Sequence, residues 1–204
     1  TSEKHLDPSA VSRGSSLERD NNGLLTLAGG KITDYRKMAE GAMERVVEIL
    51  KGEFDRSFKI INSKTYPVSG GELNPANVDS EIEAFAQLGV SRGLDSKEAF
   101  YLANLYGSNA PKVFALAHSI EEAPGLSLAD TLSLHYAMRN ELALSPVDFL
   151  LRRTNHMLFM RDGLDAIVEP VLDEMGRFYD WTEEEKAAYR NDVQAALANN
   201  DLEE

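Results

Sequence analysis

The chain contains the run Leu24-Leu25-Thr26-Leu27-Ala28-Gly29-Gly30-Lys31-Ile32-Thr33-Asp34-Tyr35-Arg36-Lys37-Met38-Ala39-Glu40, in which an apolar segment ends at two glycines and a helical pattern begins at once. Because glycine has no Cβ, Gly29 and Gly30 let the backbone approach another group closely. The following helix directs its first free N–H groups and the positive end of its dipole at whatever lies there. The run predicts a strand–turn–helix whose turn can hold an anion or an electron-rich ring edge. A tight strand-to-helix connection without a ligand is the alternative interpretation.

The residues around this turn predict a small strand–helix arrangement. Asn21-Asn22-Gly23 is typical of a hairpin turn, so we expect short strands near 12–18 and 24–28, the second of them buried. Apolar residues then recur at spacings of three and four, which predicts a helix over Thr33–Lys51 with Thr33 as its N-cap. Gly52 is the expected stop of this helix.

A connector is expected after this helix, over residues 53–76. The segment contains Pro67, Gly70-Gly71 and Pro75, and this composition favours turns over regular elements. A short strand over Phe58–Ile61 fits within it. We therefore place the boundary between the two parts of the chain here.

The rest of the chain has the pattern of successive helices. Expected helices cover 78–88, 96–106, 111–121, 127–138, a segment from Ser145, 163–179 and 182–198. Asp95 and Thr182 begin capping boxes, and Pro111 suits a first turn, whereas Pro170 predicts a kink or break. Four aromatics at helical spacing are expected in the core: Phe100, Tyr101, Tyr106 and Phe114. The predicted fold class is mainly α, with an all-helical domain over 77–204 preceded by a short strand–turn–helix.

Charge and composition exclude several classes of protein. The net charge is −13, and all of the excess acid follows residue 60, because residues 1–60 contain equal numbers of basic and acidic side chains. Such a balance argues against nucleic-acid binding, which needs basic patches. The chain has no cysteine, which excludes disulfides and thiol chemistry. No apolar run reaches the length of a membrane span, and the first residues are polar, so we expect a cytoplasmic protein.

Candidate polar sites are few. Arg13 lies in a polar turn beside the first expected strand, and arginine suits bidentate contacts with phosphate or carboxylate. Arg139-Asn140-Glu141 and Arg152-Arg153 are interpreted as a structural ion network in which Glu141 pairs with an arginine, with a second anion site as the alternative. The four histidines show no metal-binding spacing, so no metal site is expected: His5, His118, His135 and His156.

Three motifs, in order, resemble the FAD-dependent glycerol-3-phosphate dehydrogenase family. The segment Gly29-Gly30-Lys31-Ile32-Thr33-Asp34-Tyr35-Arg36-Lys37-Met38-Ala39-Glu40 is similar to a signature of that family. So are Pro8-Ser9-Ala10-Val11-Ser12-Arg13 before it, and Tyr136-Ala137-Met138-Arg139-Asn140-Glu141-Leu142-Ala143 with Asp148-Phe149-Leu150-Leu151-Arg152-Arg153-Thr154 near the end. The resemblance covers essentially the whole chain. It is closest to the oxidase branch, the alpha-glycerophosphate oxidases of streptococcal type.

The resemblance implies that the chain is the C-terminal portion of a flavoprotein. Residues 1–52 would form the end of the FAD-binding domain, 53–76 the connector, and 77–204 the helical C-terminal domain. The family's catalytic histidine and FAD fingerprint lie upstream, so no catalytic residue is expected in this chain. The resemblance assigns FAD contacts to Gly29, Gly30, Lys31, Ile32 and Thr33. It assigns the phosphate of the substrate to Arg13.

The implied reaction is oxidation of sn-glycerol 3-phosphate to dihydroxyacetone phosphate, with oxygen reduced to hydrogen peroxide. FAD would be held by the full-length enzyme and not retained by this chain alone. The expected partners are the substrate, oxygen and the N-terminal FAD domain of the same protein, with a homo-oligomer left open. Two alternatives remain: a quinone-linked dehydrogenase, and a non-catalytic helical interaction module.

Overall fold

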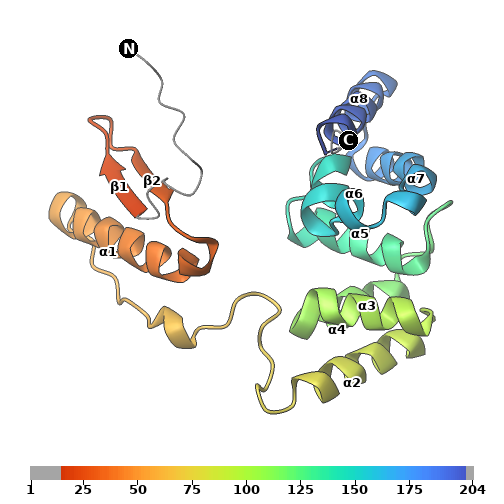
Figure 1. Ribbon diagram of the computed structural model, residues 1–204, viewed down its shortest axis with the longest axis horizontal. Coiled ribbons are helices and arrows are strands. Elements are labelled where there is room, and N and C mark those ends of the chain that lie inside the picture. Colours follow the sequence, from red (N-terminus) through yellow and green to blue (C-terminus); the bar gives the residue numbers. More distant parts are fainter. Residues whose placement is uncertain (1–14, 201–204) are drawn as a thin grey trace, which may run out of the picture. The chain divides into compact units, whose positions relative to one another are not determined.

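The computed structural model describes residues 15–200, and the chain divides into two compact units, 1–67 and 68–204. Figure 1 shows a hairpin and one long helix in the first unit and only helices in the second. The predicted fold class, a helical domain preceded by a strand–turn–helix, is confirmed.

The first unit begins with an antiparallel hairpin. Strands β1 (Ser15–Arg19) and β2 (Leu25–Gly29) pair so that Ser15 faces Gly29 and Arg19 faces Leu25. The turn is closed by the N–H of Gly23, which donates to the carbonyl of Asp20 at 3.0 Å, and Gly23 has a φ of 91°. This positive φ explains why the sequence has glycine there. The predicted turn at 21–23 is confirmed.

The long helix of the first unit, α1 (Tyr35–Phe54), starts and ends later than the sequence predicts. Thr33 is not its N-cap, because residues Ile32–Asp34 form a separate 3-10 turn. Gly52 is not its stop. The chain leaves the helix at Asp55, whose φ is 52° and whose N–H donates to the carbonyl of Leu50. A short polar aspartate tolerates this left-handed conformation, so Asp55 ends the helix three residues after the glycine that was expected to end it.

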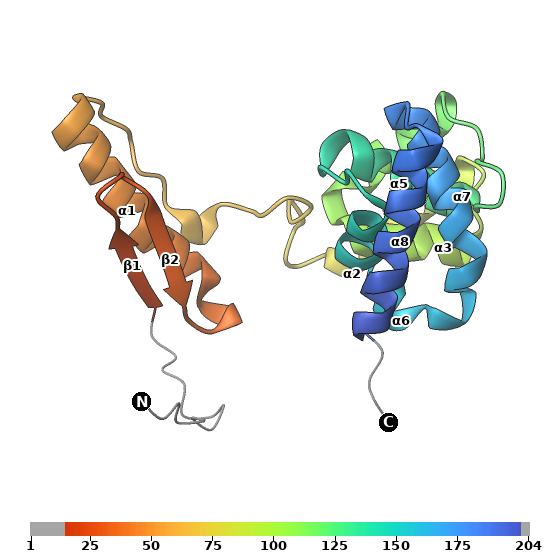
Figure 2. The same ribbon diagram turned by 90° about the horizontal axis from the view of Figure 1, so that it is seen from above.

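The first unit buries little of its apolar surface. Figure 2 shows the hairpin lying along α1, and an ion pair between Arg19 and Glu53 joins the two. The prediction of a buried strand at 24–28 is wrong, since Leu24 is 59% and Leu27 40% exposed. One helix cannot cover both faces of a two-stranded sheet. Residues 58–61 line a groove together with α1 but do not form the predicted strand.

The second unit contains only helices within its described residues. They are α2 (Val78–Ser91), α3 (Ser96–Tyr106), α4 (Ala110–Ala115), α5 (Leu128–Asn140), a π-helical turn (Asp148–Arg153), α6 (His156–Phe159), α7 (Arg161–Tyr179) and α8 (Glu183–Asn200). The predicted caps are confirmed: the Asp95 carboxylate accepts the N–H of Lys97 at 2.8 Å, and Thr182 and Glu185 form a reciprocal capping box. Pro111 lies in the first turn of α4.

Two predictions about these helices need correction. Residues 111–121 are not one helix, because α4 ends at Ala115 and a 3-10 turn covers Leu116–His118. Pro170 does not break its helix, because α7 continues through it over 19 residues, and the alternative of a kink stays a prediction. A proline removes one N–H donor from the helix, and the next two residues, Val171 and Leu172, are fully buried, so packing supports the helix at this point.

The core of the second unit is built around α5. Every residue of α5 from Ala129 to Met138 is buried except Asp130. One buried cluster joins α5 to α2, α3 and α4, and a second joins it to α6, α7 and α8. Figure 1 shows α5 between these two groups of helices. The helical unit therefore has a core of its own, and its expected aromatic members Tyr106 and Phe114 belong to it, whereas Phe100 and Tyr101 are exposed.

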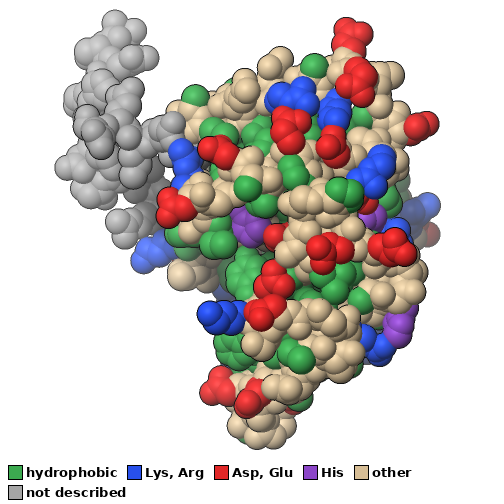
Figure 3. Space-filling view, turned by 90° about the vertical axis from the view of Figure 1, so that its right-hand side faces the viewer, with side chains coloured by type: hydrophobic (Ala, Val, Ile, Leu, Met, Phe, Trp, Pro, Cys, Tyr) green, Lys and Arg blue, Asp and Glu red, His purple; other side chains and the backbone are tan. Residues whose placement is uncertain are grey.

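The surface of the molecule mixes charges with apolar side chains. Figure 3 shows one face on which acidic side chains are spread among basic and hydrophobic ones. In the described part of the chain, none of the helices combines the length and apolar character that a membrane span needs.

Candidate functional site

The double-glycine turn occupies the junction of β2 and the 3-10 turn at Ile32–Asp34. Gly29 has a φ of 85° and Gly30 a φ of 89°, so both adopt the conformation that side chains with a Cβ rarely take. A Cβ at Gly30 would also collide with the Sδ atom of Met38 on the first turn of α1. Both glycines are thus required by the backbone path, and the Met38 side chain fills the space that a Cβ of Gly30 would take.

Two backbone donors beyond the turn have no partner within residues 15–200. The N–H of Asp34 donates to the carbonyl of Lys31 at 2.9 Å, but within residues 15–200 no hydrogen bond uses the N–H of Ile32 or Thr33. Among the described residues, no side chain caps this end of the helix. Ile32 is 90% exposed. Free N–H groups at a helix start attract anions and polar ring edges, and binding of such a group at this turn stays a prediction.

Of the predicted site residues, Gly29, Gly30, Lys31, Ile32 and Thr33 are brought together at this turn. Lys31 has extended backbone angles (φ −82°, ψ 149°) and lies at the surface. Arg13 lies outside the described residues, so its position relative to the turn stays a prediction.

The arginines of the helical unit have structural roles. The guanidinium of Arg153 donates to the carbonyl oxygen of Glu141 through Nε at 3.1 Å, and its Nε lies 3.9 Å from the Glu141 carboxylate. Burial raises the pKa of the Glu141 carboxyl, and Arg153 opposes that rise. Arg152 pairs with Asp148 at 2.8 Å. The predicted pairing of Glu141 with an arginine is confirmed.

The described histidines have three different environments. His118 contacts Arg92, and the Nε2 atom of His135 lies 2.8 Å from the Glu174 carboxylate, with both side chains buried. His156 is also buried, and its burial lowers the pKa of the imidazole. No group of three metal-ligating side chains gathers anywhere in residues 15–200.

The buried pair His135–Glu174 is a feature that the sequence interpretation missed. Its two members are 39 residues apart, so no local motif joins them. The sequence feature that could have indicated this pair is Glu174, because it lies on the buried face of α7 between Val171 and Met175. A carboxylate at such a position needs a partner.

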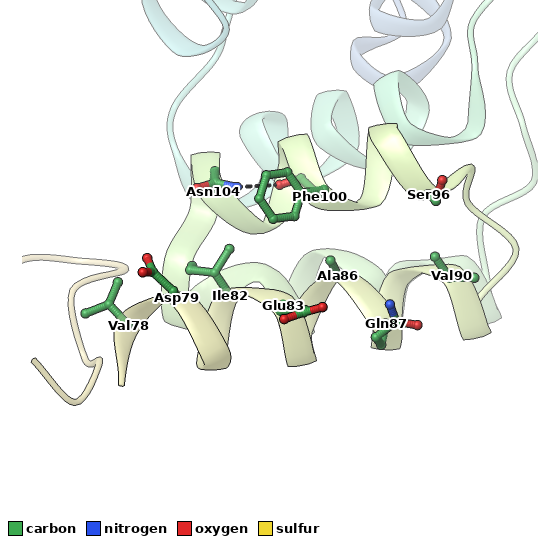
Figure 4. A pocket seen from close by; sticks show the side chains of 10 residues that line it. All are labelled: Val78, Asp79, Ile82, Glu83, Ala86, Gln87, Val90, Ser96, Phe100 and Asn104. Carbon is green, nitrogen blue, oxygen red and sulfur yellow. Dashed lines mark hydrogen bonds between the residues drawn. The ribbon is translucent and has the colours of Figure 1, made fainter. Parts of the chain in front are cut away.

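Grooves are present in both units, each lined by its own residues. In the first unit a groove of about 540 Å³ lies between α1 and the segment 58–61, with Met43 and Val46 among its apolar lining. In the second, a groove of about 460 Å³ separates α2 from α3. Figure 4 shows Ile82 and Val90 of α2 pointing toward α3 and Phe100 pointing toward α2. Neither groove contains a nucleophile paired with a base.

Comparison with known proteins gives one family for this chain. The family described as the C-terminal domain of alpha-glycerophosphate oxidase matches residues 61–186. An alpha-glycerophosphate oxidase of Streptococcus pneumoniae is 92% identical over 204 residues, which are 100% of this chain and 34% of that protein. One of Enterococcus casseliflavus is 51% identical over 97% of this chain and 32% of that protein. The chain thus spans about a third of the length of these curated relatives.

A solved structure agrees with this result. The glycerol-3-phosphate dehydrogenase from Bacillus halodurans, solved in complex with FAD, matches with a TM-score of 0.79 and 31% identity, over 89% of this chain and 36% of that one. The match covers 89% of the chain, which is more than either unit contains, so it includes residues of both the first unit and the helical unit.

Proposed function

Because the chain belongs to the family of C-terminal domains of alpha-glycerophosphate oxidases, we propose that it is the C-terminal part of an enzyme that oxidises sn-glycerol 3-phosphate to dihydroxyacetone phosphate. Oxygen is the proposed electron acceptor and hydrogen peroxide the product. The observation that carries the proposal is the 92% identity to an enzyme of that name over the whole of this chain. Since the chain covers a third of that enzyme, the activity is proposed for the full-length protein and not for residues 1–204 alone. Its cytoplasmic location stays a prediction.

The double-glycine turn fits a role at FAD. Gly29 and Gly30 have the positive φ values that this turn needs, and the N–H groups of Ile32 and Thr33 have no partner in the described part of the chain. When bound, FAD supplies the acceptor for the hydride that leaves the substrate. The turn, with the positive end of α1 behind it and the ammonium of Lys31 nearby, would stabilise negative charge on the ring edge that it faces. We assign residues 1–52 to the end of the FAD-binding domain on this basis.

Arg13 is the proposed ligand of the substrate's phosphate. Its guanidinium can form two parallel hydrogen bonds to phosphate, which a lysine ammonium cannot reproduce. In the full-length enzyme we expect Arg13→Lys to raise KM for sn-glycerol 3-phosphate about tenfold or more, because a charge-assisted bidentate contact is lost. An unchanged KM would remove Arg13 from the substrate site.

A quinone-linked dehydrogenase is the second candidate function. One observation favours it: the FAD-complexed dehydrogenase of Bacillus halodurans shares this fold at 31% identity. The two candidates have the same substrate and the same first half-reaction. They differ only in what reoxidises the flavin.

One experiment separates these functions. The full-length protein and residues 1–204 are mixed with sn-glycerol 3-phosphate, and flavin absorbance and peroxide are followed with and without oxygen. The proposal predicts flavin bleaching without oxygen and peroxide with oxygen, both from the full-length protein only. Bleaching without peroxide would favour the quinone-linked dehydrogenase. No bleaching at all would contradict the assigned substrate.

A further inference from the structure

The turn of the β1–β2 hairpin contains a reactive pair of residues. Asn22-Gly23 is the only asparagine–glycine pair in the sequence, and both residues are exposed. The side chain of Asn22 folds forward along the chain, because its Oδ1 atom accepts the N–H of Leu24 at 3.0 Å. That hydrogen bond polarises the Cγ–Oδ1 bond of the carboxamide. An electrophilic carbon is thereby held over the peptide unit that contains the backbone nitrogen of Gly23.

The backbone nitrogen of Gly23 is accessible for reaction. Among the described residues, a Cβ added to Gly23 would meet only the Nη2 atom of Arg19 within 4 Å, at 3.9 Å. Because glycine has no Cβ, no side chain of residue 23 shields this nitrogen. Its N–H donates to the carbonyl of Asp20 at 3.0 Å, at the end of a two-stranded sheet, which is marginally stable by itself. Opening of this hydrogen bond frees the nitrogen.

Two other asparagines have the same side-chain arrangement and allow a comparison within the chain. Asn62 and Asn74 are exposed, and the Oδ1 atom of each accepts the N–H of the residue two positions later, at 3.0 Å in both cases. The residue that follows each asparagine differs. Ser63 has a Cβ that shields its nitrogen, and Pro75 has no N–H. Of the three, only Asn22 combines a forward side chain with an unshielded N–H.

We propose that Asn22 is a site of spontaneous deamidation in the folded protein. The nitrogen of Gly23 attacks the Cγ atom of Asn22, so that an N–Cγ bond forms and the Cγ–Nδ2 bond breaks. Ammonia leaves with the proton that the Gly23 nitrogen gives up. Water then opens the cyclic succinimide at either of its two carbonyl carbons, which leaves aspartate or isoaspartate at position 22. Water is the only co-reactant. The site is separate from the proposed oxidase reaction, so failure of either proposal leaves the other unaffected.

This reaction changes the contact between the hairpin and α1, which lie side by side in Figure 2. Arg19 joins the two through its ion pair with Glu53, in which Nη2 donates to Oε2 at 2.8 Å. The same Nη2 atom is the one that lies 3.9 Å from the Cβ position of Gly23, so the guanidinium is next to the new carboxylate. A carboxylate at position 22 therefore competes with Glu53 for Arg19. Deamidation thus loosens the hairpin from the last turn of α1.

The test incubates the 204-residue chain at pH 8 and 37 °C, folded and in urea, and follows aspartate and isoaspartate formation by mass spectrometry of its peptides. The proposal predicts that Asn22 converts about tenfold or more faster than Asn62, because residue 23 has no Cβ, and that Asn74 does not convert on the same time scale. Conversion at pH 6 should be slower, because the attacking nitrogen must lose its proton. Equal rates at Asn22 and Asn62 would overturn the proposal, as would conversion of Asn22 in urea but not in the folded chain.

The variant Gly23→Asn separates the chemistry from the fold. Asparagine tolerates a left-handed backbone, as Asn155 does at a φ of 56°, and its Cβ shields the nitrogen. We expect the circular dichroism of the parent to be kept and the rate at Asn22 to fall about tenfold. An unchanged rate at Asn22 would refute attack by an unshielded nitrogen.

The variant Asn22→Asp tests the consequence, because it introduces the carboxylate directly. We expect amide hydrogen exchange in the last turn of α1 to rise about two- to fivefold, which corresponds to the loss of a surface ion pair. Asn62→Asp, which adds the same charge at another turn of the first unit, is the matched control and should leave this exchange unchanged. Equal exchange in Asn22→Asp and the parent would contradict the competition for Arg19.

Discussion

At the scale of single residues, two glycines show how differently the same residue type is used. Gly89 of α2 lies where a Cβ would be 2.9 Å from both the Ala99 Cβ and the Phe114 Cζ, so only glycine permits the close packing of α2 on α3. Gly163 of α7 has no such neighbour. Their sequence contexts are both helical, and the difference comes from tertiary packing alone.

We expect Gly89→Ala to destabilise the helical unit by about 1–3 kcal/mol, because the added methyl group overpacks a core that already contains the fully buried Phe114. Gly163→Ala should instead stabilise by about 0.5–1 kcal/mol through helix propensity. Urea unfolding of the 204-residue chain, followed by circular dichroism, measures both. Equal effects of the two substitutions would show that α2 and α3 are not packed as described.

His156 should make the helical unit sensitive to acid. Burial depresses the pKa of His156 in the folded state below its ordinary value of 6.5. The unfolded chain therefore binds a proton at His156 more readily than the folded chain does. The stability that the neutral, buried His156 contributes above pH 6.5 is lost as the pH falls below 6.5 toward the pKa of the folded state. We predict that the urea midpoint decreases less between pH 7.5 and pH 5 in His156→Gln than in the parent chain. His118→Gln, at an exposed histidine, should keep the parent's pH dependence, and the same loss in all three proteins would exclude His156 as the cause.

At the scale of elements, local signals predicted the starts of α3 and α8 well, and both ends of α1 less well. Asp95 and Thr182 cap their helices as expected, because a cap uses residues only two or three positions apart. The end of α1 was missed because any short polar residue, here Asp55, can adopt a left-handed conformation. The burial of a strand and the pairing of His135 with Glu174 depend on contacts across the unit, which no local pattern encodes. The double-glycine turn could be predicted because it is a local element of the sequence, and its role as a site stays a prediction.

The cap of the last helix gives a test at this scale. Thr182 donates to and accepts from Glu185 in a reciprocal arrangement. Thr182→Ala should lower the free energy of unfolding by about 1 kcal/mol, because the first N–H groups of α8 lose their acceptor. Thr182→Ser, which keeps the hydroxyl, should restore most of it. Equal losses in the two variants, measured by urea unfolding, would mean that the threonine acts through packing and not as a cap.

At the scale of the whole molecule, the two units differ in how much of their apolar surface is buried. The helical unit has two buried clusters around α5, whereas α1 of the first unit has no buried residue. The proposed function accounts for this contrast, because in the full-length enzyme the apolar surface of the first unit would pack within the FAD-binding domain. The same proposal gives the free N–H groups of Ile32 and Thr33 a ligand.

The most direct test of this account is turnover of sn-glycerol 3-phosphate by the full-length enzyme carrying Lys31→Ala, with Lys51→Ala as the control and the thermal unfolding midpoint measured alongside. Lys31 is exposed beside the double-glycine turn, and Lys51 is exposed near the end of α1. We predict that Lys31→Ala lowers turnover about tenfold or more, because the positive charge proposed at the flavin ring edge is lost, while its unfolding midpoint stays close to that of the parent, and that Lys51→Ala changes neither. If Lys31→Ala lost stability and activity in equal measure, or kept full turnover, the turn would be a structural connection and not a site at the flavin.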